Sequence, residues 1–377
     1  MQSLQCSLTT LGVATSLLFG MTACQPQSDT SKELPRTEQT TPTEQSKQAA
    51  IAVPKPITAS MTAVDAKTCL ALNDAMQNVN NESNIEAIYT VQQTLKACLP
   101  TASNAEVIAL LKSYQAMYTR FLGNNDTLDA VFGEPFFAVM SALEQKEKVP
   151  TEDLKKLPPR LQYLVELVQN GADVSVQYLG EGNYNLTHDL QAMADIFIPY
   201  LQQDQKAFIE RLAKDNQGIL WNDGGIAISF AEVMERAVFW EDYIARYPHG
   251  YAYQDAKQLS ETYRYLLFFG SENTQWTDDT IHEFIAPEYR PLMLKLARRP
   301  NSVLAKDAQK LLDFMSLSDS QRQDKYPTPD IDENGYEMDE WAVARYQIKE
   351  ALSIASPWQV NNKNCFEGVI CVEQDMQ

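Results

Sequence analysis

The sequence has little of what catalytic motifs are made from. It contains three histidines, at positions 188, 249 and 282, and His282-Glu283 continues as Phe-Ile-Ala, so no HExxH zinc motif is present. It also lacks a GxSxG nucleophile elbow, a phosphate-binding P-loop and a GxGxxG dinucleotide motif. Acidic pairs such as Glu241-Asp242 are too common in an acidic chain to indicate a glycosidase. These absences favour a protein that is not an enzyme.

Positive charge is scarce as well. The chain has 31 Lys and Arg against 50 Asp and Glu, which gives a formal net charge of −19. A surface this acidic repels phosphate backbones, which argues against nucleic acid as a partner. The same repulsion disfavours direct adsorption to anionic lipid. Any association with a membrane therefore has to be supplied by another feature of the chain.

Long apolar runs are also missing, except near the start. Residues 1–23 carry no charge, and the apolar run from Leu8 to Gly20 is shorter than the ~20 residues that span a bilayer. Small residues then precede Cys24, an arrangement that resembles the signal peptide of bacterial lipoproteins. It departs from that pattern at Met21, where Leu is usual, and in having no Lys or Arg near the start. An ordinary secretory signal peptide or a buried helix is the alternative.

The lipoprotein resemblance implies that Cys24 is lipidated after cleavage. Gln25 follows it instead of Asp, which in the lipoproteins of Gram-negative bacteria implies the outer membrane. Residues 24–60 are rich in Gln, Ser, Thr and Pro, and they predict a disordered linker that spans roughly 30–36 Å. We therefore expect a membrane contact through the lipid anchor, with the remainder of the chain facing the periplasm.

The other cysteines fit an exported protein. With Cys6 in the signal peptide and Cys24 lipidated, an even set remains: Cys69, Cys98, Cys365 and Cys371. Two predicted helices, 65–79 and 84–97, folded as a hairpin around Asn80–Ser83, would bring Cys69 to Cys98. Closing that loop contributes ~3–4 kcal/mol in the loop-entropy model. Cys365 and Cys371 would close a short C-terminal loop. Redox or metal roles are the alternatives, but no CxxC and no nearby His supports them.

The body of the chain predicts an all-α fold with one small β-hairpin at 174–188, which turns at Gly180-Glu181-Gly182. Ser229 and Glu232 predict a capping box, Gly270 a left-handed helix cap, and Asp278-Asp279 the first turn of a helix. We divide the chain into an α-helical domain at 61–320 and a C-terminal segment at 321–377. The further predicted helices are 104–121, 125–146, 158–169, 188–202, 204–214, 229–246, 254–269, 288–298, 302–315 and 339–354.

One internal repeat indicates how these helices pair. The segment Ala245–Leu259 matches Ala297–Leu311, with identities at Ala, Arg, Pro, Asp, Ala and Leu. A helix that ends before Pro, followed by a helix that begins near Asp, predicts a helical hairpin in each copy. Small Ala256 and Ala308 would let the paired helices approach closely. The alternative is a junction that recurred in an ordinary all-helical domain.

The phrase FWEDYIARYPHGYAYQDA resembles the helix–turn–helix of tetratricopeptide-like outer-membrane lipoproteins, over about 240–315. The spacing of 52 residues is longer than the 34 of that family. The resemblance implies stacked hairpins, solenoid-like in form, which hold partner proteins. It makes a scaffold or binding module for another envelope protein the favoured function.

An acidic loop predicts a cation site. Oxygen-bearing side chains alternate around Gly335 and lead into the helix at 339–354, as the hard cation Ca²⁺ requires. Trp341 stands where an EF-hand has Glu, and prolines precede the loop, so it is not a full EF-hand. The alternative is a solvated acidic loop. The predicted ligands of a structural Ca²⁺ are Asp330, Asp332, Asn334, Tyr336, Asp339 and Glu340.

Aromatic residues gather in the middle of the chain, around a tight turn at Trp221–Ile226. Trp221, Trp240, Tyr247 and Tyr251 are the predicted binding surface for peptide or glycan, with a place in the core as the competing reading. Two further functions stay open. One is an envelope hydrolase that acts on peptidoglycan or glycan, which would need two carboxylates about 5–9 Å apart. The other is a calcium-stabilised surface protein that interacts with a host.

Overall fold

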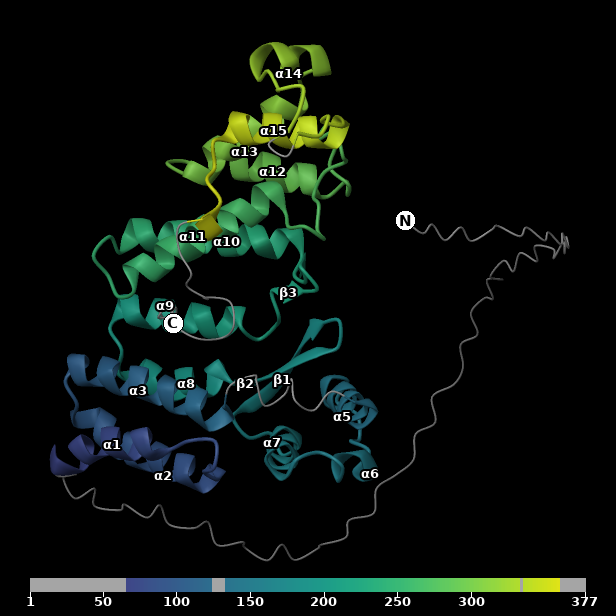
Figure 1. The fold of residues 1–377 in the computed structure, drawn as a ribbon. Helices are drawn as coiled ribbons and strands as arrows, with labels where there is room; N and C mark the ends of the chain where they lie inside the picture. The colour runs from purple at the N-terminus through teal and green to yellow at the C-terminus, as the bar shows by residue number, and fades with distance from the viewer. Residues whose placement is uncertain (1–65, 124–132, 333–334, 360–377) are drawn as a thin grey trace, which may run out of the picture. The chain divides into compact units, whose positions relative to one another are not determined.

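A computed structural model describes residues 66–123, 133–332 and 335–359. Contacts divide the chain into Met1–Ser60 and Met61–Gln377, and all described residues belong to the second unit. This unit is mostly helical, with two small antiparallel sheets, which confirms the predicted all-α fold with a β-hairpin (Figure 1). None of the described helices combines the length and apolarity needed to cross a bilayer.

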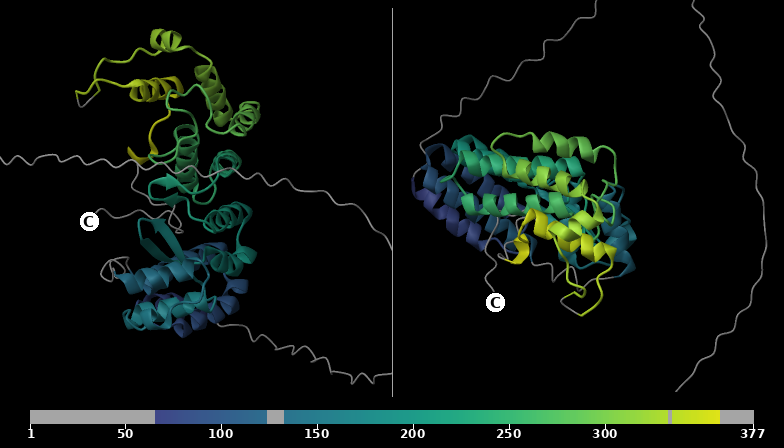
Figure 2. Two further views of the ribbon diagram at one scale, coloured as in Figure 1. Left: turned by 90° about the vertical axis from the view of Figure 1, so that its right-hand side faces the viewer. Right: turned by 90° about the horizontal axis from the view of Figure 1, so that it is seen from above.

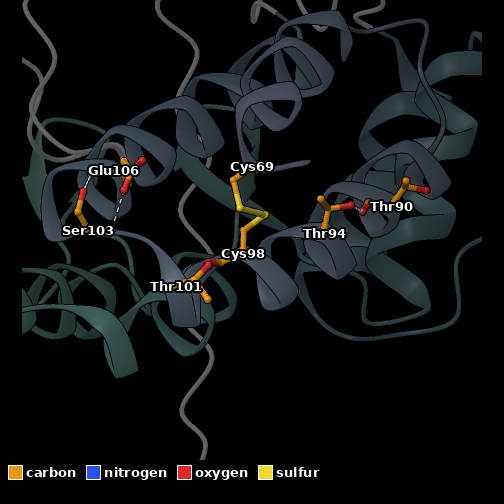
Figure 3. The surroundings of a disulfide bond; sticks show 7 residues. All are labelled: Cys69, Thr90, Thr94, Cys98, Thr101, Ser103 and Glu106. Atoms are coloured by element: carbon orange, nitrogen blue, oxygen red, sulfur yellow. Dashed lines mark hydrogen bonds between the residues drawn. A yellow bond between two sulfur atoms is a disulfide. The ribbon is translucent and has the colours of Figure 1, made fainter. Parts of the chain in front are cut away.

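Helices α1 (Ala66–Asn78) and α2 (Ile85–Cys98) form the predicted N-terminal hairpin. Asn84 caps α2, since its Oδ1 accepts from the backbone N–H of Ala87 at 3.3 Å. A disulfide joins Cys69 to Cys98 across the open end, with the Cα atoms 5.6 Å apart (Figure 3). This pairing is confirmed, whereas Cys24, Cys365 and Cys371 lie outside the described residues.

The next helices surround the predicted β-hairpin. Strand β1 (Val174–Gly180) pairs with β2 (Asn183–His188) in antiparallel register, Val174 opposite His188. Helices α3, α5 and α7 pack against this hairpin. The predicted helix at 125–146 is described only from Glu134 to Glu144. The elements of this region are η1 (Leu99–Thr101), α3 (Asn104–Leu122), α5 (Glu134–Glu144), α6 (Thr151–Leu154), α7 (Pro159–Gln169), α8 (Leu190–Phe197) and η2 (Ile198–Tyr200).

Both copies of the repeat form helical hairpins, as predicted. Helix α10 (Phe230–Arg246) pairs with α11 (Tyr253–Phe269), and α12 (Tyr289–Ala297) pairs with α13 (Val303–Met315). Ala256 and Ala308 are fully buried, which permits the close approach of each pair. The two hairpins also contact each other, and α9 (Gln203–Asp215) packs on α10.

Two predictions about single side chains were wrong in detail. Ser229 accepts from the backbone N–H of Glu232 at 3.2 Å, but the Glu232 carboxylate binds Arg236 at 2.6 Å instead of completing a capping box. Asp307 does not lie in a first helical turn, because α13 begins at Val303 and Asp307 is buried against Arg264 at 2.7 Å. In both cases an ion pair determines where the side chain points, with Arg236 one turn along the same helix for Glu232 and with Arg264 on α11 for Asp307.

Asp278 does not begin a helix. Its carboxylate accepts from the backbone N–H groups of His282 and Glu283, each at 2.8 Å, and so it organises a loop. The predicted stop of α11 at Gly270 is confirmed, but φ 70° and ψ −144° are not the left-handed helical conformation. A Cβ there would lie 2.0 Å from the carbonyl oxygen of Thr274, so only Gly fits this turn.

The C-terminal elements pack on the second hairpin. Helix α15 (Glu340–Leu352) contacts α13, and η3 (Pro357–Gln359) returns to contact α11, while α14 (Asp319–Lys325) follows α13 (Figure 2). A second hairpin is made of β3 (Trp221–Asn222) and β4 (Gly225–Ile226), and β3 also contacts β1. Its central residues Asp223 and Gly224 both have positive φ, which explains the Asp-Gly sequence of this predicted turn.

Candidate functional site

The predicted aromatic surface does not form as a unit. Trp240 is fully buried and packs edge-on against Phe208, with ring centroids 5.3 Å apart, so it belongs to the core and cannot be a binding residue. Tyr247 and Tyr251 are half-buried against the same core. The backbone N–H of Tyr251 donates to Asp204 at 2.7 Å, which ties the turn between α10 and α11 to α9. Only Trp221 of the predicted set lines a sizeable pocket.

That pocket has a volume of about 960 Å³ and is lined by aromatic side chains from four elements. We call it the aromatic groove and define it by the aromatic residues of β3, α11, α15 and η3. Three of them are substantially exposed: Trp341 at 45%, Trp358 at 48% and Tyr346 at 37%. Large apolar side chains rarely remain exposed together unless a partner covers them. The defining residues are Trp221, Tyr265, Phe269, Trp341, Tyr346 and Trp358.

Helix spacing explains why α15 contributes so much to the groove. Trp341, Arg345 and Lys349 recur every four residues, so all three lie on one face of the helix, with Tyr346 beside them. Asp339 determines where this helix begins, because its carboxylate accepts from the backbone N–H of Ala342 at 2.8 Å. The start of α15 therefore sets which residues face the groove.

The opposite wall is built by aromatic contacts. Tyr265 and Phe269 lie one turn apart on α11, with ring centroids 4.7 Å apart. Trp358 packs edge-on against Tyr265 at 5.3 Å and against Trp221 at 6.4 Å. Edge-on aromatic pairs of this kind are favourable beyond their buried area. They hold Trp221 and Trp358 in place while half of the Trp358 side chain stays open to solvent.

Charged groups in the groove are few. Arg345 and Lys349 supply positive charge, and Glu272 and Asp332 supply negative charge. Burial lowers the pKa of Arg345, an effect that nearby Asp279 opposes, and burial also raises the pKa of Tyr265. An arginine stays protonated under either influence at neutral pH. The groove thus offers a fixed cation in an apolar, aromatic setting.

The acidic loop forms a tight turn beside the groove. The backbone N–H of Asp332 donates to the carbonyl of Tyr336 at 2.8 Å, and Ile331 bridges to Glu337. The Asp332 carboxylate accepts from the N–H of Tyr336, the Asp339 carboxylate caps α15, and the Tyr336 side chain is 72% exposed. Asn334 lies outside the described residues. Among those described, no group of three His, Cys, Asp or Glu side chains is placed to hold a metal, and Ca²⁺ stays a prediction.

One buried carboxylate has the raised pKa that is expected of a general acid. Burial raises the pKa of Asp215, although Arg236 and Arg211 oppose the shift. The cavity beside it is only about 10 Å³, room for about one water molecule. Asp215 pairs with Arg211 at 2.9 Å and with Arg236 at 3.5 Å. These contacts make it part of a structural ion cluster with no space for a substrate.

The histidines serve the fold in the part of the chain that the structure describes. His282 lies between Arg322, at 2.9 Å from its Nδ1, and Asp319, at 2.8 Å from its Nε2. His188 stacks on Tyr118 with ring centroids 3.4 Å apart, and its Nε2 is buried without a partner among the described residues. His249 is exposed in the turn between α10 and α11.

Comparison with models of known families, with curated proteins and with solved structures gives no match to this chain.

Sequence reasoning missed most of the groove. It identified Trp221, but not Tyr265, Phe269 or Trp358, which come from elements far apart in the chain. A signal was present in the predicted helix at 339–354, where Trp341, Arg345 and Lys349 share one face. An aromatic residue and two cations on a helix face that should pack inward would have marked that face as a candidate site.

Proposed function

We propose that this protein is a lipid-anchored scaffold of the bacterial cell envelope, which holds a segment of another envelope protein in the aromatic groove. The observation that carries the proposal is the exposure of Trp341, Tyr346 and Trp358 around one pocket of about 960 Å³. Trp and Tyr are enriched at the centres of protein interfaces, because they bury much area at a low cost in entropy. A pocket of this size and lining suits a ligand or a peptide segment.

The groove supports binding better than catalysis. Among the described residues, its carboxylates are Glu272, which is exposed, and Asp332, whose oxygen accepts from a backbone N–H. A hydrolase of glycans needs one carboxyl held protonated by a dry setting, beside a second that stays ionised. The aromatic walls, in contrast, need no further group to bind apolar side chains.

The location part of the proposal rests on residues 1–60. Lipid on Cys24 would attach the chain to the outer membrane, and the following linker would leave the helical unit free to reach partners in the periplasm. The acidic chain, with a net charge of −19, gives a reason for such an anchor, since it would not adsorb to anionic lipid by itself. Labelling with a palmitate analogue, lost in Cys24→Ser, tests this part.

Photocrosslinking in intact cells tests the binding part. A photoreactive phenylalanine analogue replaces Tyr346 in the groove or, as the matched control, Tyr89 on α2, since the two side chains are equally exposed at 37% and 36%. We expect a crosslinked product with a second protein from position 346 and none from position 89. Equal products from both positions, or no product from position 346, would contradict the proposal.

A further inference from the structure

Arg345, which is half-buried, has fewer hydrogen-bond partners among the described residues than the buried Arg322. Within the described ranges, its only hydrogen bond runs from Nη1 to the carbonyl of Phe269 at 3.5 Å, and its Nε is buried and unpaired. Arg322, by comparison, donates to the carbonyls of Phe314, Thr280 and Ile281 at 3.2, 2.5 and 2.8 Å. A guanidinium has five N–H groups, and leaving them unpaired away from water is costly.

Water reaches part of the Arg345 side chain but not its Nε, which is buried without a hydrogen-bond partner among the described residues. Arg290 on α12 is exposed and also has no ion pair among the described residues, but water can satisfy it. Arg345 is half-buried, and its guanidinium carbon lies 5.5 Å from the ring centroid of Trp341. No carboxylate of the described part of the chain lies within ion-pair distance of it, in a protein with 50 acidic residues. The Arg345 guanidinium therefore lines the groove without a carboxylate of the described residues to neutralise its charge.

Lys349 extends the same feature. It follows Arg345 by one helical turn, lines the same groove and makes no ion pair with any described residue. Two like charges four residues apart on a helix repel each other and destabilise it slightly. An anion bound between them removes that repulsion, and a carboxylate can accept two parallel hydrogen bonds from a guanidinium. The pair is complementary to a single negative group.

We infer that the aromatic groove binds an extended peptide segment with a carboxylate next to apolar or aromatic side chains, the carboxylate against Arg345 and Lys349. This inference rests on the proposed function and names the class of its partner. Aromatic-lined grooves bind extended peptides through their side chains, and the ends of chains through their carboxylates. A peptide fits better than a glycan because the lining is mostly apolar and offers few neutral polar side chains to sugar hydroxyls, chiefly those of Ser271 and Gln275.

Selection from a random peptide library tests the inference. The full-length protein in detergent selects from displayed 12-residue peptides, and the enriched sequences are then synthesised and titrated by fluorescence anisotropy. We expect Asp, Glu or the free C-terminus next to Trp, Tyr, Phe or Pro. Amidating the C-terminus, or replacing Asp and Glu by Asn and Gln, identifies which carboxylate is bound.

Variants then locate the carboxylate. Arg345→Gln should weaken the selected peptides by about tenfold or more, because it removes charge-assisted hydrogen bonds. Arg345→Lys should retain part of the affinity, and Arg290→Gln, which makes the same change of charge outside the groove, should retain all of it. A melting temperature measured for each variant separates loss of binding from loss of folding.

The outcomes distinguish the inference from the function on which it rests. Selected peptides without a carboxylate, or with equal affinity for Arg345→Gln, overturn the inference, while crosslinking at position 346 would still support a protein partner. Binding of a hexuronate oligosaccharide in place of peptides also overturns it. Self-association through the groove, detected by light scattering, overturns it in favour of a second copy of the chain. Failure of the crosslinking experiment itself removes the proposed function.

Discussion

Two sites in this molecule hold arginines in opposite ways. Between α9 and α10, Arg211 and Arg236 are buried with Asp215 between them, and each also binds an exposed glutamate, Glu235 or Glu232, at 2.6 Å. In the aromatic groove, Arg345 is half-buried, and among the described residues it has one long hydrogen bond, to a backbone carbonyl. The first site has its counter-charges within the fold. The aromatic groove has space for a ligand beside Arg345, which makes no ion pair with any described residue.

The two sites differ in what the arginine charge does: in the ion cluster it is paired within the fold, and in the groove it is open to a ligand. A buried charge is tolerated when its hydrogen bonds are satisfied, and removing one partner leaves the others uncompensated. Arg345, which has one long hydrogen bond and no ion pair among the described residues, contributes little to the fold, so its removal should cost little stability. Substitution of Arg211 or Arg236 should therefore lower stability, whereas substitution of Arg345 should weaken binding.

The largest expected effect comes from the ion cluster. Arg236→Ala should lower the free energy of unfolding by about 3–5 kcal/mol, because it leaves Asp215 buried beside one arginine and removes the hydrogen bond to Tyr263. Arg345→Ala, the matched change in the groove, should cost within about 1 kcal/mol. Chemical denaturation of both variants measures the free energy of unfolding. An equal decrease in both would show that the two arginines do not differ in their contribution to stability.

His188 is a third buried basic group, and it avoids the cost of burial by staying neutral. Burial lowers the pKa of His188 from 6.5 to about 3, so the folded state binds fewer protons than the unfolded state below pH 6.5. Stability should fall as the pH drops through this window, by about 2–3 kcal/mol from this group at pH 4.5. Denaturation of His188→Gln across the same pH range should show a shallower loss. His249→Gln, in an exposed turn, is the control and should follow the native curve.

The groove aromatics should affect binding more than folding. Trp341→Ala removes a side chain that is 45% exposed, so the free energy of unfolding should fall by only about 1–2 kcal/mol. Crosslinking from position 346 should nevertheless fall severalfold, because the ring forms one wall of the groove. Tyr89→Ala, at a comparable exposure outside the groove, should leave crosslinking unchanged. A loss of crosslinking in both variants would indicate that the effect is not specific to the groove.

The smallest effect concerns the acidic loop that contributes Asp332 to the groove. If the loop takes up Ca²⁺ as its sequence predicts, calorimetric titration should give heat that disappears in Asp330→Ala. A loop that binds no cation gives no heat in either protein. The result matters for the comparison, because a bound cation would offset the negative charge of the loop that contributes Asp332 to the groove.

The hairpins could be predicted from the sequence because their signals are local. Apolar spacing, Pro after Arg299 and Ser at position 302 place the ends of helices through steric and hydrogen-bonding rules that act over a few residues. The Cys69–Cys98 pairing followed from the same local folding. The side chains of Glu232 and Asp307 were placed wrongly because their partners, Arg236 and Arg264, compete with the local rule through charge.

The groove could not be predicted because its walls meet only in the folded chain. Trp221, Tyr265 and Trp358 are separated by many residues, and no periodicity relates them. Trp240, which has the same chemistry, is fully buried, so an aromatic residue alone does not indicate a surface. Exposure is a property of packing, which depends on every neighbouring element.

The class of the fold, the paired helices of the repeat and one disulfide can be read from the sequence, because each depends on spacing along a short stretch of chain. Which charges are neutralised and which aromatic residues are exposed becomes visible only once the chain is folded. Burial and ion pairing depend on distances in space between segments that are far apart in the chain, and those distances follow only from the packing of the whole unit. Thus Arg236 has its counter-charges within the fold, whereas Arg345 faces a groove that can accept one from a partner.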